Sequence, residues 1–305
     1  MDEKNTGSYT QAVACLTPEL AELAMTLPAE MQGDAEELRL RAGQPMRWAA
    51  NGQEHTFAGA PVRAEMLRDV LARASRWSVH TFQEPLSQGY LPLQGGHRLG
   101  VCGTVTFAEG RIQGIRTVSS LSLRIAREWQ GVAEPVLPEI WDGIHGVQGT
   151  LILSAPGGGK TTFLRDLIRL LSQNGIRVGV ADTRGELAAM RGGVPQFVLG
   201  GQCDVLDGCP KALAALQLVR TMAPQVLALD EVTDPQDLDA IRYAANCGVT
   251  VLATIHAADA SELRRKPFFR ALCESGAFTR LVTLTVGAEG RSCRITALEG
   301  GTEPC

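Results

Sequence analysis

The chain has 305 residues, of which 45% are hydrophobic and 20% charged, and its formal net charge at pH 7 is −4. This length suffices for two ordinary domains or one large one, and the composition is typical of a soluble globular protein with a sizeable core. A mildly acidic chain lacks the broad phosphate-neutralising surface of nucleic-acid-binding proteins, so no nucleic-acid partner is expected.

The sequence also argues against a membrane-spanning protein, a secreted protein and a protein stabilised by a bound metal. No apolar run reaches the roughly 18 residues that a membrane-spanning helix needs, and the polar start lacks the pattern of a secretory signal. The eight cysteines contain no CxxC pair and no histidine cluster lies near them, which argues against a zinc site. We therefore expect a cytoplasmic protein with reduced thiols and no membrane span.

The N-terminal part, residues 1–134, is predicted to be a small domain of mixed α and β structure. Thr17 precedes Pro18 and apolar residues at helical spacing, so a helix is expected to start there with Thr17 as its cap. Residues 37–41 alternate in polarity and end at a turn, as a strand does. The other elements expected here are a helix at 62–75, strands of a small antiparallel sheet at 89–93 and 97–107, and a closing segment at 122–127.

Residues 135–149 are predicted to be a linker, because glycine and proline are frequent from 131 to 149. In the remaining domain, 150–305, apolar strand-like runs alternate with amphipathic stretches. This alternation predicts a parallel sheet that is buried on both faces. The expected strands are 150–154, 176–181, 196–199, 226–229 and 249–254, the helices are 161–171, 211–220 and 237–245, and 281–286 with 293–297 form a final hairpin.

A glycine-rich phosphate loop is the most specific motif, and it follows the first of these strands. Its glycines let backbone N–H groups turn inward around phosphate oxygens, its lysine reaches the β- and γ-phosphates, and a hydroxyl holds Mg²⁺. The following helix directs its N-terminal dipole at the anion. The alternative is a structural glycine turn before a helix. The expected nucleotide-binding residues are Pro156, Gly157, Gly158, Gly159, Lys160, Thr161 and Thr162, and Thr161 is also expected to bind the metal.

Two acids, Asp230 and Glu231, end the apolar strand at 226–229. Asp230 would lie at the carboxyl end of the strand beside the phosphate loop, where it can hold a magnesium-bound water. Glu231 can polarise the attacking water as general base. The pattern is weak by itself, but 70 residues after Lys160 it leaves room for two further strands, as in ATPases of the additional-strand type.

The next strand ends at His256, with Thr254 as its neighbour. A polar residue at this position lies near the γ-phosphate, so His256 is expected to sense that phosphate, although a lone histidine is more often structural. Asp182 and Glu186 follow the strand at 178–181 and form a candidate acidic box at the edge where open α/β sheets bind ligands. An ordinary polar loop with a solvated salt bridge explains them equally well.

Together these residues resemble the secretion ATPases that power type II, type IV and pilus machines. In those proteins a phosphate loop, an acidic box, a magnesium-site strand and a histidine box occur in the same order. The resemblance is closer to one branch, the stage III sporulation protein AA family, and it covers most of residues 35–260. Beside the four motifs, it is carried by 37–43, 89–90, 95–103, 123–128, 160–166 and 220–224.

The resemblance implies an α/β protein with a RecA-like P-loop NTPase core and a smaller N-terminal α+β domain. It also implies a ring-forming, hexameric ATPase that uses ATP and Mg²⁺ on the mother-cell side of a forming endospore. Its partners would be membrane-embedded channel proteins around the forespore. Arginines of the N-terminal domain would reach the nucleotide, also that of a neighbouring subunit, at Arg98, Arg124 and Arg127. A permanent charge and a forked shape suit arginine to phosphate, and a solvated arginine at a strand edge is the alternative.

Two positions depart from the family's pattern. Ser154 stands where the first glycine of the phosphate loop usually lies, and Thr183 replaces the first glutamate of the acidic box. The second change shifts the catalytic role toward Glu231. We expect in-line attack of water on the γ-phosphate, with Lys160, Glu231 and His256 as catalytic residues. An ATP-gated oligomeric scaffold with little turnover and a nucleic-acid motor are alternatives on the same core, and the acidic balance disfavours the motor.

Overall fold

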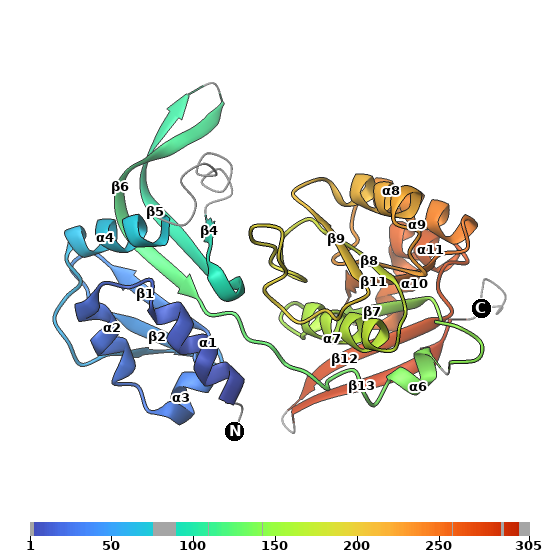
Figure 1. Ribbon diagram of the computed structural model, residues 1–305, viewed down its shortest axis with the longest axis horizontal. Coiled ribbons are helices and arrows are strands. Elements are labelled where there is room, and N and C mark those ends of the chain that lie inside the picture. Colours follow the sequence, from blue (N-terminus) through green and yellow to red (C-terminus); the bar gives the residue numbers. More distant parts are fainter. Residues whose placement is uncertain are drawn as a thin grey trace. The chain divides into compact units, whose positions relative to one another are not determined.

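Strand pairing divides the chain into two sheets, each at the centre of its own unit (Figure 1). The computed structural model describes residues 3–75, 90–108, 110–141, 143–257, 259–287 and 290–298. The first unit is Met1–Glu128 and the second is Trp129–Cys305, and each has its own hydrophobic core. Every helix within the described ranges is too short or too polar to cross a membrane.

The first unit is an antiparallel sheet of six strands in the order β3-β2-β1-β6-β5-β4, packed against helices. Polar alternation decides which face is buried, because in β1 Leu38 and Leu40 are fully buried and the charged residues beside them are half-buried. The predicted antiparallel sheet is therefore confirmed. Its elements are α1 (Glu3–Val13), α2 (Pro18–Met25), α3 (Ala29–Asp34), β1 (Glu37–Arg41), β2 (Arg47–Ala50), β3 (Gln53–Thr56), α4 (Ala64–Ser75), β4 (Tyr90–Pro92), η1 (Gln94–Gly96), β5 (Arg98–Ala108) and β6 (Arg111–Arg124).

Two local details of this unit differ from the expectation. Thr17 occupies the position before α2, but its side chain makes no capping hydrogen bond, and among the described residues its buried hydroxyl has no partner. Pro18, at the start of the helix, reduces the need for a cap, because proline has no N–H that would otherwise lack an acceptor there. Gly89, the expected first residue of a strand, lies outside the described residues.

β5 and β6 continue past their neighbours as a two-stranded arm (Figure 1). The pairing first shifts register at Gly103, where a Cβ would come 1.8 Å from the carbonyl oxygen of Thr117. Only glycine permits so close an approach of two backbones. The exposed large apolar side chains of the arm are Val105, Phe107 and Ile112.

The second unit contains a seven-stranded sheet in the order β13-β12-β7-β11-β10-β8-β9. Neighbouring strands are parallel except β13, which pairs antiparallel with β12. Its bounds are β7 (Thr150–Ser154), β8 (Val178–Asp182), β9 (Cys203–Asp207), β10 (Val226–Leu229), β11 (Thr250–His256), β12 (Arg280–Gly287) and β13 (Gly290–Ala297). The helices are α6 (Leu137–Ile140), α7 (Lys160–Gln173), α8 (Lys211–Thr221), α9 (Pro235–Asn246), α10 (Ala260–Arg265) and α11 (Pro267–Cys273).

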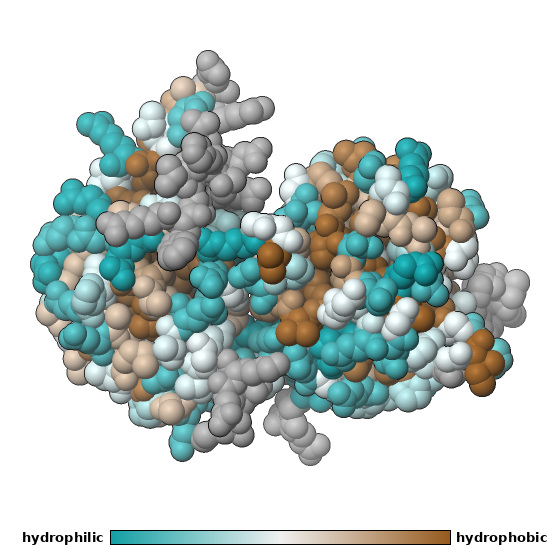
Figure 2. Space-filling view, viewed as in Figure 1, coloured by the Kyte–Doolittle hydropathy of each residue, from teal (hydrophilic) through white to brown (hydrophobic). Residues whose placement is uncertain are grey.

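Both faces of this sheet are buried, as the continuous apolar runs predict. Successive residues of a strand point to opposite faces, so Leu227 and Leu229 of β10 join one apolar cluster, and Val226 and Ala228 join the other. The first cluster is covered by α8, α9 and α11, and the second by α6 and α7. On the visible surface of the unit, hydrophobic residues are interspersed with hydrophilic ones (Figure 2).

The predicted strand at 196–199 is wrong, and the edge strand is β9 instead. The run is apolar because it packs on α7. The guanidinium of Arg165 lies 3.7 Å from the ring centroid of Phe197, and Leu199 is buried in the same cluster as α7. A short apolar run therefore marks a packed loop here as readily as a strand.

The segment before residue 150 packs into the core of the second unit. Ala133, Val136 and Ile140 are buried in the cluster of α7, although 135–149 was expected to be a linker. Asp166 of α7 anchors it, because its carboxylate accepts a 2.8 Å hydrogen bond from the Ala133 N–H and pairs with Arg169 at 2.7 Å. The buried ion pair of Asp166 and Arg169, with the Ala133 N–H as a third partner, fixes this segment on α7.

Asp166→Ala is expected to destabilise the second unit by about 3–5 kcal/mol, because it leaves the Arg169 guanidinium buried without its charge partner. The Asp166 side chain is 0% exposed and that of Arg169 is 8% exposed. Glu134→Ala is the matched control, since Glu134 contacts the same guanidinium at 3.8 Å from a side chain that is 64% exposed. It should cost under about 1 kcal/mol. Urea unfolding followed by tryptophan fluorescence measures both, and equal losses would contradict the anchoring role.

Candidate active site

A glycine-rich loop joins β7 to the N-terminus of α7. Gly157 and Gly159 have φ angles of +76° and +91°, which side chains other than glycine's rarely allow. A Cβ on Gly158 would lie 2.4 Å from the Ser154 hydroxyl oxygen, so this position also has no room for a side chain. The loop can therefore wrap with its backbone N–H groups directed inward, as an anion cradle requires.

Lys160, the first residue of α7, is buried beneath this loop, with 4% of its surface exposed. Its ammonium donates to the carbonyl and hydroxyl oxygens of Ser154 at 3.4 Å and contacts Nδ1 of His256 at 2.9 Å. Burial lowers the pKa of Lys160, against the charges of Asp230 and Glu231, which raise it. Ser154, a departure from the usual glycine, thus supplies an acceptor for the lysine.

Strand order brings the other predicted residues to the same edge of the sheet. β11 lies between β7 and β10, all three run parallel, and His256 is the register partner of Ser154. Asp230 and Glu231 follow β10 directly, so they emerge at the same carboxyl edge. An inserted strand between the loop strand and the acidic strand is the arrangement expected for an additional-strand ATPase.

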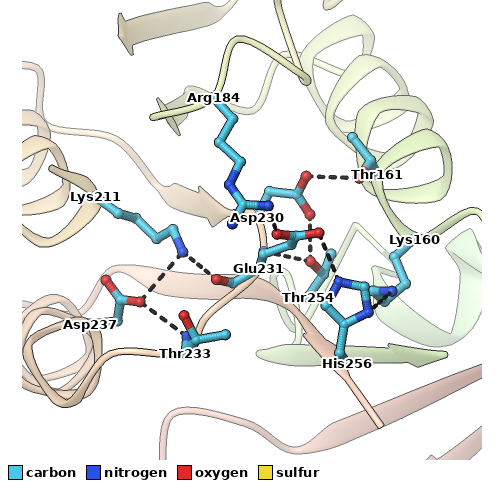
Figure 3. A network of polar contacts seen from close by, with 10 residues as sticks. All are labelled: Lys160, Thr161, Arg184, Lys211, Asp230, Glu231, Thr233, Asp237, Thr254 and His256. Atoms are coloured by element: carbon cyan, nitrogen blue, oxygen red, sulfur yellow. Dashed lines mark hydrogen bonds and ion pairs between the residues drawn. The ribbon is translucent and has the colours of Figure 1, made fainter. Parts of the chain in front are cut away.

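Asp230 connects the helix after the loop to the sheet (Figure 3). Its carboxylate accepts a 2.8 Å hydrogen bond from the Thr161 hydroxyl of α7 and a 2.5 Å hydrogen bond from the Thr254 hydroxyl of β11. Burial raises the pKa of Asp230, and the two hydrogen bonds offset only part of that effect. The carboxylate therefore sits where a bound cation would favour its ionised form.

Glu231 is held in a strained backbone conformation, with φ at +50°. Its N–H donates to the Thr254 hydroxyl at 2.8 Å, and its carboxylate contacts Nε2 of His256 at 2.8 Å and the guanidinium of Arg184. Burial raises the pKa of Glu231, but the hydrogen bond from His256 and the charge of Arg184 outweigh it, so the pKa falls below its usual value. Strain of this kind commonly marks a functional position.

His256 links the lysine to the glutamate, and the contacts define its tautomer. A protonated lysine can only donate, so Nδ1 of His256 must accept from Lys160. The ring proton is then on Nε2, which donates to Glu231. The three side chains form one continuous chain of hydrogen bonds (Figure 3).

Lys211 and Asp237 buttress the turn after β10 and were not identified from the sequence. The Lys211 ammonium donates to the Glu231 carbonyl oxygen at 2.5 Å and pairs with Asp237 at 3.4 Å. Asp237 also accepts from the backbone N–H groups of Thr233 and Asp234, at 3.2 and 3.3 Å. Asp237 contacts Asp234 within the capping box that starts α9, which is a local pattern, whereas the contacts of Lys211 cross from α8 and no local sequence pattern indicates them.

The two acids of the candidate acidic box differ, since Asp182 is buried and Glu186 is half-buried. The carboxylate of Asp182 accepts backbone N–H bonds from Glu186, Leu187 and Ala188 at 2.8, 3.1 and 2.8 Å. Asp182 is 2% exposed and shapes the loop that follows β8. Glu186 lies close enough to Asp230 for its charge to raise the pKa of that residue.

A pocket of about 220 Å³ opens on this side of Asp230 and Glu231. Its lining combines acids and bases of β8, α8 and α9 and of the turns that follow β8 and β10. Six of the residues that line it are Asp182, Thr183, Arg184, Glu186, Lys211 and Asp237.

Arg98, Arg124 and Arg127 belong to the first unit, whereas all other predicted site residues belong to the second. Arg98 and Arg124 are register partners across β5 and β6, and the guanidinium of Arg98 lies 5.0 Å from the ring centroid of Tyr90. Arg127 pairs with Glu36 at 2.7 Å. Their predicted role toward nucleotide stays a prediction.

Comparison with known proteins adds family and fold to this geometry. The family model described as sporulation stage III, protein AA, matches residues 19–300. Stage III sporulation protein AA of Bacillus subtilis (strain 168) is 36% identical over 281 residues, which cover 90% of each chain. Both matches extend across the two units.

Solved structures with the same fold include an ATPase and a pilus retraction motor. The ATPase DotB of Yersinia pseudotuberculosis matches with a TM-score of 0.62 and 15% identity, covering 93% of this chain and 80% of that one. The pilus retraction motor PilT, crystallised with ADP, matches with a TM-score of 0.61 and 16% identity, covering 93% and 83%. Identities this low support a shared fold alone. The chain thus has the RecA-like P-loop fold of secretion ATPases and belongs to the stage III sporulation protein AA family.

Proposed function

We propose that this protein is a magnesium-dependent ATPase. The observation that carries the proposal is the continuous network from Lys160 through His256 to Glu231, at the mouth of a glycine loop that can cradle phosphate. A lysine, a magnesium-site carboxylate and a general base at one carboxyl edge are the groups that phosphoryl transfer to water requires.

Each residue has a defined task in the proposed reaction. Glu231 accepts a proton from the attacking water, whose oxygen bonds to the γ-phosphorus as the bond from that phosphorus to the β-phosphate oxygen breaks. The lowered pKa of Glu231 keeps it ionised and able to take this proton near neutral pH. The charge that grows on the γ-phosphate oxygens lies within reach of Lys160. His256 connects these two groups and so can couple phosphate binding to the position of the base.

Thr161 and Asp230 fit a magnesium ion. The Thr161 hydroxyl donates a hydrogen bond to Asp230, which leaves the lone pairs of the hydroxyl oxygen available to a cation. When bound, Mg²⁺ would neutralise charge on the β- and γ-phosphates. Within the described ranges no three His, Cys, Asp or Glu residues are grouped to hold a metal by themselves. That suits an ion that takes most of its ligands from phosphate and water.

The proposed cellular role rests on family membership and on the secretion-ATPase fold. We place the protein in a homo-oligomeric ring, a hexamer, in the mother-cell cytoplasm beside the membranes around the forespore. There it energises or assembles a membrane-embedded sporulation channel complex. Arg98, Arg124 and Arg127 of the first unit are proposed to contact nucleotide bound to a neighbouring subunit.

A second candidate, an ATP-gated scaffold with little turnover, is favoured by one observation. Both carboxylate oxygens of Glu231 are engaged, one by His256 and the other by Arg184. Each of these contacts lowers the basicity of the carboxylate, so a base held in this way takes up a proton less readily than a free one. Thr183 in the acidic box, where the family pattern has glutamate, leaves the loop without a second carboxylate at that position.

Lys160→Ala is expected to weaken nucleotide binding about 100-fold or more, because charge-assisted bonds to the β- and γ-phosphates are lost. Isothermal titration calorimetry with magnesium and a non-hydrolysable ATP analogue measures the change. Lys266→Ala is the matched control, since Lys266 is a 53% exposed lysine that pairs with Glu262. Unchanged affinity in Lys160→Ala would refute the site.

Glu231→Gln is expected to lower steady-state phosphate release about 100- to 10,000-fold, because glutamine cannot accept the proton. Affinity for the ATP analogue should change only a few-fold. Glu134→Gln, an exposed glutamate of the same unit, is the control for charge removal. Equal phosphate release by wild type and Glu231→Gln would favour the scaffold.

Lys211→Met is expected to lower turnover about 10- to 100-fold with little effect on analogue affinity, since it releases the turn that positions Glu231. Lys211→Arg keeps a donor and should retain most activity. Separate measurement of kcat and KM tests this. A rise in KM with normal kcat would contradict a role in positioning the base.

A further inference from the structure

An arginine of the C-terminal hairpin reaches the phosphate loop from within the same unit. β12 runs parallel to β7, and the last residue of β12 paired with β7 is Thr283, opposite Leu153. β12 then continues past the point where β7 gives way to the loop. β13 returns antiparallel and sets Arg291 opposite Val286, three residues or about 10 Å beyond that last pair. The hairpin thus carries Arg291 to the level of the loop.

The side of the sheet on which Arg291 lies follows from strand alternation. Ile295 packs against the apolar cluster that contains α7. Arg291 is four residues earlier on the same regular strand, so its side chain lies on the α7 face. Accordingly, a Cβ built on Gly159 would be 3.7 Å from Cζ of the Arg291 guanidinium.

Arg291 adds a positive charge beside the loop, and no carboxylate of the described residues pairs with it. Arg291 is exposed, and among the described residues its side chain makes no hydrogen bond or ion pair. It stands beside Gly159, which immediately precedes Lys160 and the positive end of the α7 dipole. The positive charges of Arg291, Lys160 and the N-terminus of α7 repel one another, and a polyphosphate bound among them would attract all three.

We propose that Arg291 binds the phosphates of a nucleotide held by its own subunit. The assignment rests on the proposed nucleotide site and adds to it a cation supplied in cis. It is distinct from the three arginines of the first unit, whose proposed nucleotide belongs to a neighbouring subunit. A guanidinium presents two parallel N–H groups that match two phosphate oxygens, a fixed geometry that a lysine ammonium lacks.

Arg291→Ala is expected to weaken binding of a non-hydrolysable ATP analogue about 10- to 100-fold, the effect of losing charge-assisted hydrogen bonds. Inorganic tripolyphosphate, which has no base or ribose, should lose affinity by the same factor. Arg291→Lys, which keeps the charge but not the fork, should fall between wild type and alanine. Calorimetry with full-length protein measures all three, and circular dichroism establishes that each variant is folded.

Arg294→Ala is the matched control. Arg294 is an exposed arginine on the same strand, three residues later and therefore on the opposite face. Its removal changes the net charge by the same amount and should leave both affinities within about two-fold of the wild-type values. Equal losses in the two variants would reduce the effect to general electrostatics and overturn the assignment.

Two other results would overturn it as well. Wild-type affinity in Arg291→Ala would remove Arg291 from the site while leaving the proposed function intact. A loss with the ATP analogue but none with tripolyphosphate would place the guanidinium on the base or ribose instead. Absence of nucleotide binding by the wild-type protein would overturn the proposed function together with this assignment.

Discussion

One half-buried carboxylate, that of Asp230, holds together the elements on which the candidate site depends. Its carboxylate accepts hydrogen bonds from the hydroxyls of Thr161 in α7 and Thr254 in β11. The Thr254 hydroxyl in turn accepts a hydrogen bond from the N–H of Glu231. The start of the loop helix, the inserted strand and the strained residue are therefore fixed by adjoining hydrogen bonds. An uncompensated carboxylate would be costly at this depth, which gives these hydroxyls their structural importance.

The contacts of Lys160 and Glu231 with His256 explain how the proposed enzyme would respond to nucleotide. Lys160 is occupied by His256, and Glu231 is occupied by His256 and Arg184. A γ-phosphate competes for Lys160, so its arrival removes the donor that fixes the His256 tautomer, and the histidine contact to Glu231 is then free to change. The proposed ATPase and the scaffold differ only in whether that release makes Glu231 available to water.

The sequence predicted those parts of the site that local chemistry encodes. Glycines before Lys160, and an apolar strand before Asp230 and Glu231, reflect backbone and burial requirements that are visible within a few residues. Lys211 was missed because its partner, the Glu231 carbonyl, is distant in the chain. Asp182 was found, but its main contacts are backbone N–H groups that only the folded loop presents. The run at 196–199 was misjudged because burial against α7 and pairing in a sheet select the same residue types.

The proposed function assigns nucleotide binding to the second unit and contacts with a neighbouring subunit to the first. Lys160 and Arg291 both come from the second unit, so these proposed phosphate contacts need no residue of the first. The proposed contribution of the first unit's arginines is to the charge that develops during transfer, on a nucleotide held by a neighbouring subunit. Binding would be a property of the single chain, and turnover a property of the ring.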